Sequence, residues 1–122
     1  ENSAQFSSTS VSIRQGLENH PQKMELEDLL TGPMALGTLL EKAGFPAVPS
    51  ASDTAPAAGD LFFSGGHNTR IHGSRDQGMI DAIQLELNRE GLRNESADRM
   101  RFAKRFANIL VEYLEAHYSD VF

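Results

Sequence analysis

Residues 96–117 carry the strongest structural signal, because their apolar side chains recur at intervals of three and four residues. This spacing predicts one α-helix with an apolar stripe, and charged side chains occupy the opposite face. The stripe consists of Met100, Ala103, Phe106, Ala107, Leu110, Tyr113, Leu114 and His117. Phe102 and Ile109 lie beside it, which predicts either a wide buried face or a second subunit that covers it. Asn94 or Ser96 is the expected N-cap.

Residues 79–87 alternate between two sets of side chains, a pattern typical of a β-strand. One face carries Met79, Asp81, Ile83, Leu85 and Leu87, and the other carries Ile80, Ala82, Gln84 and Glu86. Gln84 and Glu86 are therefore expected to point the same way. Residues 11–14 and 67–71 predict two further short strands, separated from the rest by polar or glycine-rich turns.

The first 60 residues predict two short helices followed by a loop. Leucines at helical spacing in residues 24–30 are interrupted by Thr31-Gly32-Pro33, and a second helix is expected to begin at Pro33 and to end at Gly44. Residues 45–60 are rich in proline and alanine and predict a surface loop. Residues 1–10 are polar and predict a loose lead-in. The length and composition predict one compact domain of 122 residues.

Composition excludes several classes of protein. The net charge of −6 argues against non-specific binding to nucleic acid. No run approaches the roughly 18 apolar residues that a membrane span requires, which predicts a soluble chain. The chain has no cysteine, which excludes disulfides and thiolate chemistry. It begins at Glu1 without an initiating methionine or a signal segment, which predicts a processed chain, a proteolytic product or a trimmed one.

The residues that suggest chemistry lie between Asp60 and Arg89. Glu86 follows apolar neighbours on the predicted strand and is a candidate general base; the alternative is an ion pair with Arg70, Arg75 or Arg89. Arg70 is a candidate contact for a substrate carboxylate, or else it pairs with Asp81 or Glu86. His67, His72 and Glu86 are possible metal ligands, although a regular strand would place the two histidines on opposite faces. His20 has no partner nearby in sequence and is expected to be an exposed loop histidine.

Three segments resemble the N-formylglutamate amidohydrolase family: Gly65-Gly66-His67-Asn68-Thr69-Arg70, His72-Gly73, and the run Ile83-Gln84-Leu85-Glu86-Leu87. That family has a Gly-Gly-aromatic-x-Thr-Arg segment, a glycine turn and a strand that carries Gln-x-Glu. The likeness extends less specifically from Val11 to the final helix. It implies an α/β fold, in which this chain is the C-terminal portion of a zinc-carboxypeptidase-like mixed sheet flanked by helices. On this reading the chain is the C-terminal chain of a larger domain, which another chain completes.

The resemblance also implies roles for single residues. Glu86 matches the carboxylate that activates a zinc-bound water, Arg70 resembles a substrate-carboxylate contact, and His67 and Gln84 resemble pocket-lining residues. Nothing in residues 1–60 resembles the family's zinc ligands, so zinc is expected in a partner, the N-terminal chain of the same precursor. His72-Gly73-Ser74 replaces a more usual aromatic-Gly turn, which leaves the substrate preference open.

Two functions follow as hypotheses. The first is a small C-terminal chain of a processed, zinc-dependent amidohydrolase-like protein that acts on an N-acyl amino acid or a related amide. The second is a non-catalytic structural or binding protein that is secreted and retains the family scaffold. Asn94-Glu95-Ser96 is a sequon for N-glycosylation, which favours secretion slightly over a cytoplasmic location.

Overall fold

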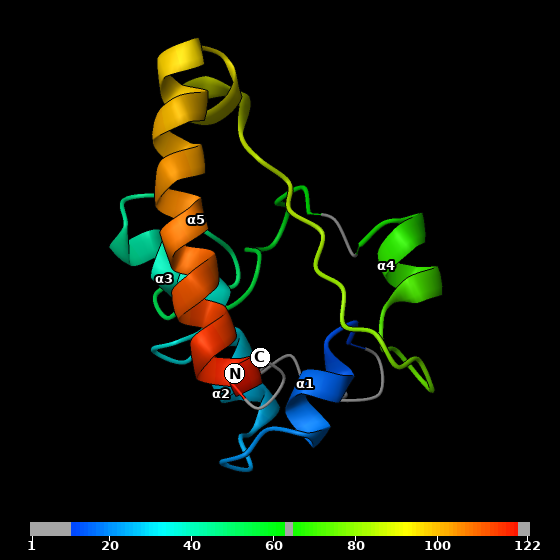
Figure 1. Cartoon of the computed structure of the whole chain (residues 1–122). Helices are drawn as coiled ribbons and strands as arrows, with labels where there is room; N and C mark the ends of the chain where they lie inside the picture. The colour runs from blue at the N-terminus through cyan, green and yellow to red at the C-terminus, as the bar shows by residue number, and fades with distance from the viewer. Residues whose placement is uncertain (1–10, 63–64, 120–122) are drawn as a thin grey trace.

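All regular elements are helices in the part of the chain that the computed structural model describes, residues 11–62 and 65–119 (Figure 1). They are α1 (Arg14–Glu18), α2 (Leu26–Thr31), α3 (Leu36–Lys42), α4 (His67–His72), a helical turn η2 (Arg89–Arg93) and α5 (Ser96–Tyr118). Turn η2 is irregular, because Gly91 has a φ of +74°. The polar lead-in predicted for residues 1–10 lies outside the described ranges.

The predicted α/β fold with a zinc-carboxypeptidase-like mixed sheet is therefore wrong, since the described residues contain no strand and no sheet. A strand exists only through ladder hydrogen bonds to a neighbour, and alternation of side chains does not supply that neighbour. Residues 81–88 are extended without a ladder. Residues 11–13 form turns before α1, and residues 67–71 are helical.

The predicted C-terminal helix is present as α5, but its buried face differs from the predicted stripe. Phe102, Ile109, Tyr113 and His117 are buried, whereas Met100 is 57% exposed. Ala103 and Ala107 are also exposed. The buried face thus combines Phe102 and Ile109, which lay beside the predicted stripe, with Tyr113 and His117 from the C-terminal half of the stripe. The helix begins after Glu95, whose side chain makes no capping hydrogen bond, so the predicted Asn94 or Ser96 cap is wrong.

The core lies where α5 packs against α3 and the residues that follow it. Its buried members are Leu39, Leu40, Phe45, Phe102, Ile109 and Tyr113. Phe102 is held between two rings: it meets Phe45 edge-on at 5.2 Å and stacks on Phe106 at 5.2 Å between ring centroids. Aromatic pairs in these geometries stabilise a core beyond the area that they bury.

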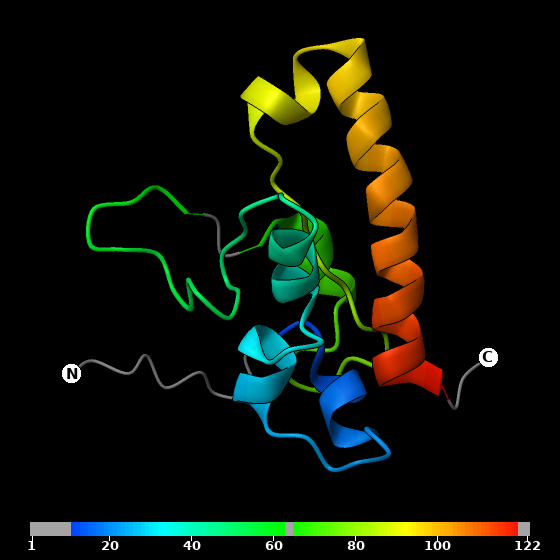
Figure 2. The ribbon, with the colours of Figure 1, turned by 90° about the vertical axis from the view of Figure 1, so that its left-hand side faces the viewer.

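The segment after α3 lies close against that helix before the chain leaves the body. A Cβ at Gly37 would overlap the carbonyl oxygen of Pro49, so only glycine permits this approach. The Ala51 amide donates to Thr38 Oγ1 at 2.9 Å. Residues 51–54 and 56–62 are exposed, and the chain projects from the body as an open loop (Figure 2).

Helix α4 replaces the strand that was predicted over residues 67–71. Gly66 precedes it in an extended conformation and accepts hydrogen bonds from the Arg70 amide at 3.1 Å and from Thr69 Oγ1 at 3.1 Å. These local bonds satisfy backbone groups that a strand would have to satisfy with a neighbour. Across residues 11–62 and 65–119, no helix is both long enough and apolar enough to cross a membrane.

Candidate functional site

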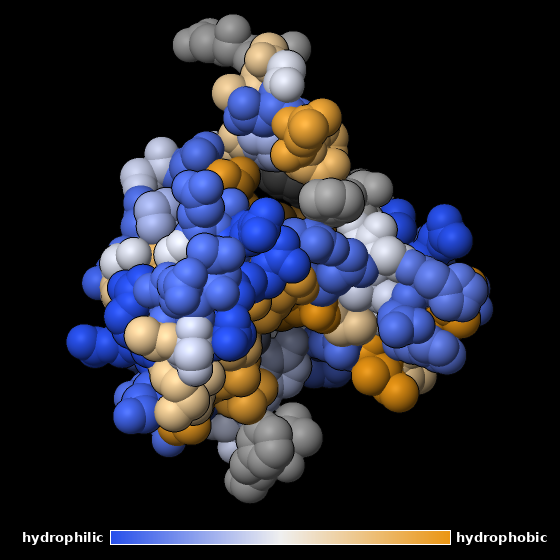
Figure 3. Space-filling view, turned by 90° about the horizontal axis from the view of Figure 1, so that it is seen from above, coloured by the Kyte–Doolittle hydropathy of each residue, from blue (hydrophilic) through white to orange (hydrophobic). Residues whose placement is uncertain are grey.

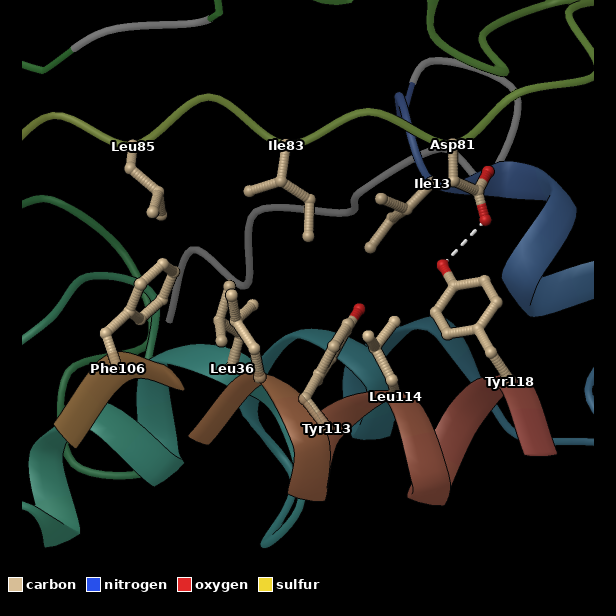
Figure 4. A pocket seen from close by; sticks show the side chains of 10 residues that line it. Ile13, Leu36, Asp81, Ile83, Leu85, Phe106, Tyr113, Leu114 and Tyr118 are labelled. Carbon is tan, nitrogen blue, oxygen red and sulfur yellow. Dashed lines mark hydrogen bonds between the residues drawn. The ribbon is translucent and has the colours of Figure 1, made fainter. Parts of the chain in front are cut away.

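The extended run of residues 81–88 connects α4 to the top of α5 and presents two different faces (Figure 1). Asp81, Ile83 and Leu85 all point toward α5, as the alternation predicts (Figure 4). Gln84 and Glu86 belong to the alternate set and are exposed. The segment therefore separates an apolar interior side from a polar outer side.

The interior side is one wall of an open groove of about 400 Å³. Helix α5 supplies most of the other wall, and Ile13 and Leu36 contribute from the first half of the chain. The remaining α5 residues of the lining are Phe106, Leu110, Tyr113, Leu114 and Tyr118. Ile83 and Leu85 remain 44% and 39% exposed, so the groove is incompletely filled by the chain's own side chains. Seen from above, apolar side chains lie at the centre of the face with polar side chains on both sides (Figure 3).

The groove is polar at one end, where Asp81 accepts four hydrogen bonds. The donors are the Gln15 amide at 3.0 Å, the Gly16 amide at 2.5 Å, Tyr118 Oη at 2.7 Å and Ser74 Oγ. We call this set the Asp81 cluster. A carboxylate with this many donors is structurally engaged, because further bonding capacity for a substrate or a metal is small. Asp81 therefore fixes α1 to the end of α5.

Arg14 extends the cluster to the turn after α4. Its side chain is buried and donates to the Ser74 carbonyl at 2.7 Å and to the Gly78 carbonyl at 2.8 Å. It also pairs with Glu18. Ser12 reaches the same region, because its carbonyl accepts from the Ala82 amide at 2.9 Å. Residues 12–16 are thereby held by residues 74–82, about 65 positions away in the sequence.

Burial raises the pKa values of the two tyrosines at this end of α5. Desolvation raises the pKa of Tyr118 strongly, and the neighbouring Tyr113 and Asp81 raise it further. Desolvation also raises the pKa of Tyr113 to about 12, partly offset by its hydrogen bond with Tyr118. Both phenols are therefore protonated at neutral pH, so Tyr118 serves as a hydrogen-bond donor and not as a base.

The structure brings together two of the three segments that carry the family resemblance. A Cβ at Gly66 would overlap Gln84 Oε1, so the glycine lies directly against the Gln84 side chain. Gln84 Nε2 in turn donates to Glu86 Oε1 at 2.5 Å. The Gly-Gly segment, Gln84 and Glu86 thus meet on the outer side of the extended run, away from the core.

Two other predicted site residues, His67 and Arg70, lie on α4 and are exposed. The ion pairs considered as alternatives for Arg70 and Glu86 are absent among the described residues, whose salt bridges are Arg14–Glu18 and Arg101–Asp98. Asn94 is exposed at the turn before α5, and its Nδ2 donates to Glu95 Oε1 at 3.1 Å.

A metal site formed by this chain alone finds no support in residues 11–62 and 65–119. No group of three or more histidine or carboxylate side chains is close enough there to hold an ion. His67, His72 and Glu86 therefore do not form a shared set of ligands.

Sequence reasoning missed a buried pair of histidines. His20 was predicted to be an exposed loop histidine, but it is 5% exposed and its Nε2 lies 3.1 Å from His117 Nδ1. His117 does pack at the end of its helix, as expected. The two residues are 97 positions apart, so no local pattern marks the pair. Asp81 did give a signal, since it is the one carboxylate on the apolar face of the alternating run.

Comparisons with protein-family models, with curated proteins and with solved structures gave no significant match. The resemblance to the amidohydrolase family therefore rests on the residues quoted above.

Proposed function

We propose that this chain is the small C-terminal chain of a processed amidohydrolase-like protein that acts on an N-acyl amino acid or a related amide. The observation that carries the proposal is the meeting of Gly66, Gln84 and Glu86 on one exposed face. These residues come from two of the three segments that resemble the family, and the two segments are about 20 positions apart in sequence.

Each residue has a role that its chemistry permits. The exposed Glu86 carboxylate accepts a proton from the attacking water and is positioned by the Gln84 amide. The Arg70 guanidinium, on the neighbouring helix α4, binds the carboxylate of the substrate, whose planar geometry it matches. His67 and Gln84 line the pocket. The zinc belongs to the partner, the N-terminal chain of the same precursor, and supplies the activation of water when it is bound.

The surface around this face is suited to a protein partner. Ile80, which alternates with Gln84 and Glu86, is 68% exposed, and Ile71 on α4 is 57% exposed. Within the described residues, the backbone amides and carbonyls of residues 83–87 have no backbone partner. Exposed apolar side chains beside polar residues are typical of protein interfaces. A partner that covers them would also exclude water from Glu86, which strengthens its electrostatic interactions with a substrate.

Native protein is expected to co-purify with a second chain and with zinc. Mass spectrometry should identify peptides of that chain as the sequence encoded immediately upstream of Glu1, and metal analysis should find about one zinc per pair. Removal of the partner should remove the zinc. A stable native monomer, without a second chain and without zinc, would rule out the proposed function.

In the intact pair, Glu86→Gln is expected to lower turnover by a factor of about 100 or more, because the amide cannot accept a proton. Zinc content should stay unchanged, since Glu86 is not assigned to the metal. Glu90→Gln is the matched control, an exposed glutamate four residues later that should leave turnover unaffected. Activity retained in Glu86→Gln would remove the role given to this residue.

A second function, a secreted binding protein without catalysis, is favoured by the exposure of the sequon. Asn94 and Ser96 are both accessible at the start of α5, as an acceptor site requires. This alternative expects a glycan on Asn94, no zinc and no amidase activity. The mass spectrum described above separates the two functions in one measurement.

A further inference from the structure

The buried His20–His117 pair joins three parts of the chain that are distant in sequence. His20 lies in the turn after α1, and His117 lies in the last turn of α5. His117 Nε2 is 3.0 Å from the carbonyl oxygen of Met34, between α2 and α3. The His20 and His117 rings lie 5.3 Å apart and are 5% and 3% exposed.

The neighbours of the pair determine where both imidazole protons lie. The Gln22 amide donates to His20 Nδ1 at 3.2 Å, so this nitrogen is unprotonated and the proton of His20 is on Nε2. The Met34 carbonyl can only accept, so His117 carries its proton on Nε2 and its Nδ1 is an acceptor. His20 Nε2–H therefore donates to His117 Nδ1. The Gln22 amide can only donate and the Met34 carbonyl can only accept, so together they fix the direction of the hydrogen bond between the two imidazoles.

An additional proton has no free site in this chain of hydrogen bonds. On His20 Nδ1 it would meet the Gln22 N–H, and on His117 Nδ1 it would meet His20 Nε2–H. Either position sets two donors against each other in a buried site, so one hydrogen bond must break. We infer that the His20–His117 pair is an acid-sensitive latch, which holds the turn after α1 against α5 while both rings are neutral and releases it on protonation.

Among the described residues, the surrounding groups give an added proton on the pair no ion-pair partner. The ionisable neighbours are Tyr113, whose ring lies 4.8 Å from that of His117, and Tyr118 and Asp81, which line a small cavity with His117. Both phenols are neutral, and the charged Asp81 carboxylate directs its oxygens at the donors of its cluster and makes no hydrogen bond with either imidazole. Burial lowers the pKa of His117, and the nearby His20 lowers it further, against a smaller opposing effect of the Met34 carbonyl.

The direction of the pH effect follows from this lowered pKa. The unfolded chain takes up a proton at His117 near the ordinary value of 6.5, and the folded chain takes it up only at lower pH. The stability that the neutral His117 contributes is therefore fully present above pH 6.5 and is lost as the pH falls below that value. Between pH 6.5 and the lower pKa of His117 in the folded chain, the equilibrium constant for folding should decrease by up to tenfold per pH unit, because the unfolded chain binds one more proton.

The test uses the full chain. Nitrogen-15 spectra of the imidazoles at pH 7.5 should show the Nε2–H tautomer for both His20 and His117. On acidification, His117 should take up its proton at a pH below the ordinary histidine value of 6.5. If His20 or His117 carries its proton on Nδ1, or if His117 titrates at or above 6.5, the latch is refuted.

Urea unfolding from pH 7.5 to 5 provides the second measurement. His117→Gln retains one donor and one acceptor but cannot be protonated, so its stability should vary less with pH than that of the wild type. The matched variant His72→Gln removes an exposed histidine and should retain the full loss in acid. Equal pH dependence in the two variants would refute the latch. If His117→Gln does not fold, the tautomers measured in the wild type decide whether the latch exists.

Discussion

Asp81→Ala is expected to lower the free energy of unfolding by about 3 kcal/mol, a large part of the roughly 5–15 kcal/mol that stabilises a small domain. The Asp81 carboxylate accepts from the amides of Gln15 and Gly16 and from the hydroxyls of Ser74 and Tyr118. Without it, these donors lose a charged acceptor, and α1 loses its link to the end of α5. Urea unfolding at neutral pH measures the change.

Two further variants separate this effect from a general loss of charge. Asp81→Asn keeps one acceptor oxygen, but the Gln15 and Gly16 amides donate to different oxygens of Asp81, so one of the two amides loses its acceptor. A loss smaller than that of Asp81→Ala is expected, because the other amide is still satisfied and the hydroxyls of Ser74 and Tyr118 can turn to accept from the NH₂ group. Asp53→Ala removes an exposed carboxylate from the loop and should change stability by less than about 0.5 kcal/mol. If Asp81→Ala is no more destabilising than Asp53→Ala, the Asp81 cluster does not hold α1.

Phe102→Ala is expected to cost about 3–5 kcal/mol, because it leaves a cavity between the rings of Phe45 and Phe106. Met100→Ala is the matched control, two residues earlier on the same helix. Its side chain is 57% exposed, and its loss should be within about 0.5 kcal/mol. Thermal or urea unfolding compares them directly. Similar losses would mean that α5 buries the face that the spacing of its apolar residues predicts.

The sequence predicts those features that arise from neighbours along the chain. Helix α5, the pair α2 and α3, and the two faces of the extended run all follow from local periodicity. The buried side of α5 does not follow from local periodicity, because Met100 and Phe102 are both apolar. Phe102 is the buried one because it faces α3 and Phe45. Turn chemistry explains α4, where Gly66 and Thr69 close local hydrogen bonds.

The sheet was mispredicted for a related reason. Alternation in residues 79–87 correctly places Asp81 and Ile83 on one face, but a ladder needs a second segment of backbone. Among the described residues, Ser12 alone bonds to the backbone of this run, through the amide and the carbonyl of Ala82. Of the candidate site, the alternation predicted that Gln84 and Glu86 share a face. Arg14, Ser74 and His20 were not recognised, because each has a partner 59 to 97 positions away.

The long separations within the Asp81 cluster and the histidine pair also bear on how the chain folds during synthesis. Helix α1 is held by Asp81, which Tyr118 also contacts, and the following turn is held by His117, so α1 and this turn complete their contacts only after α5 has left the ribosome. Contacts of high sequence separation slow folding, because the intervening chain must be ordered before they form. We therefore expect α1 to be the last of the described helices to become protected, although it is made before the others.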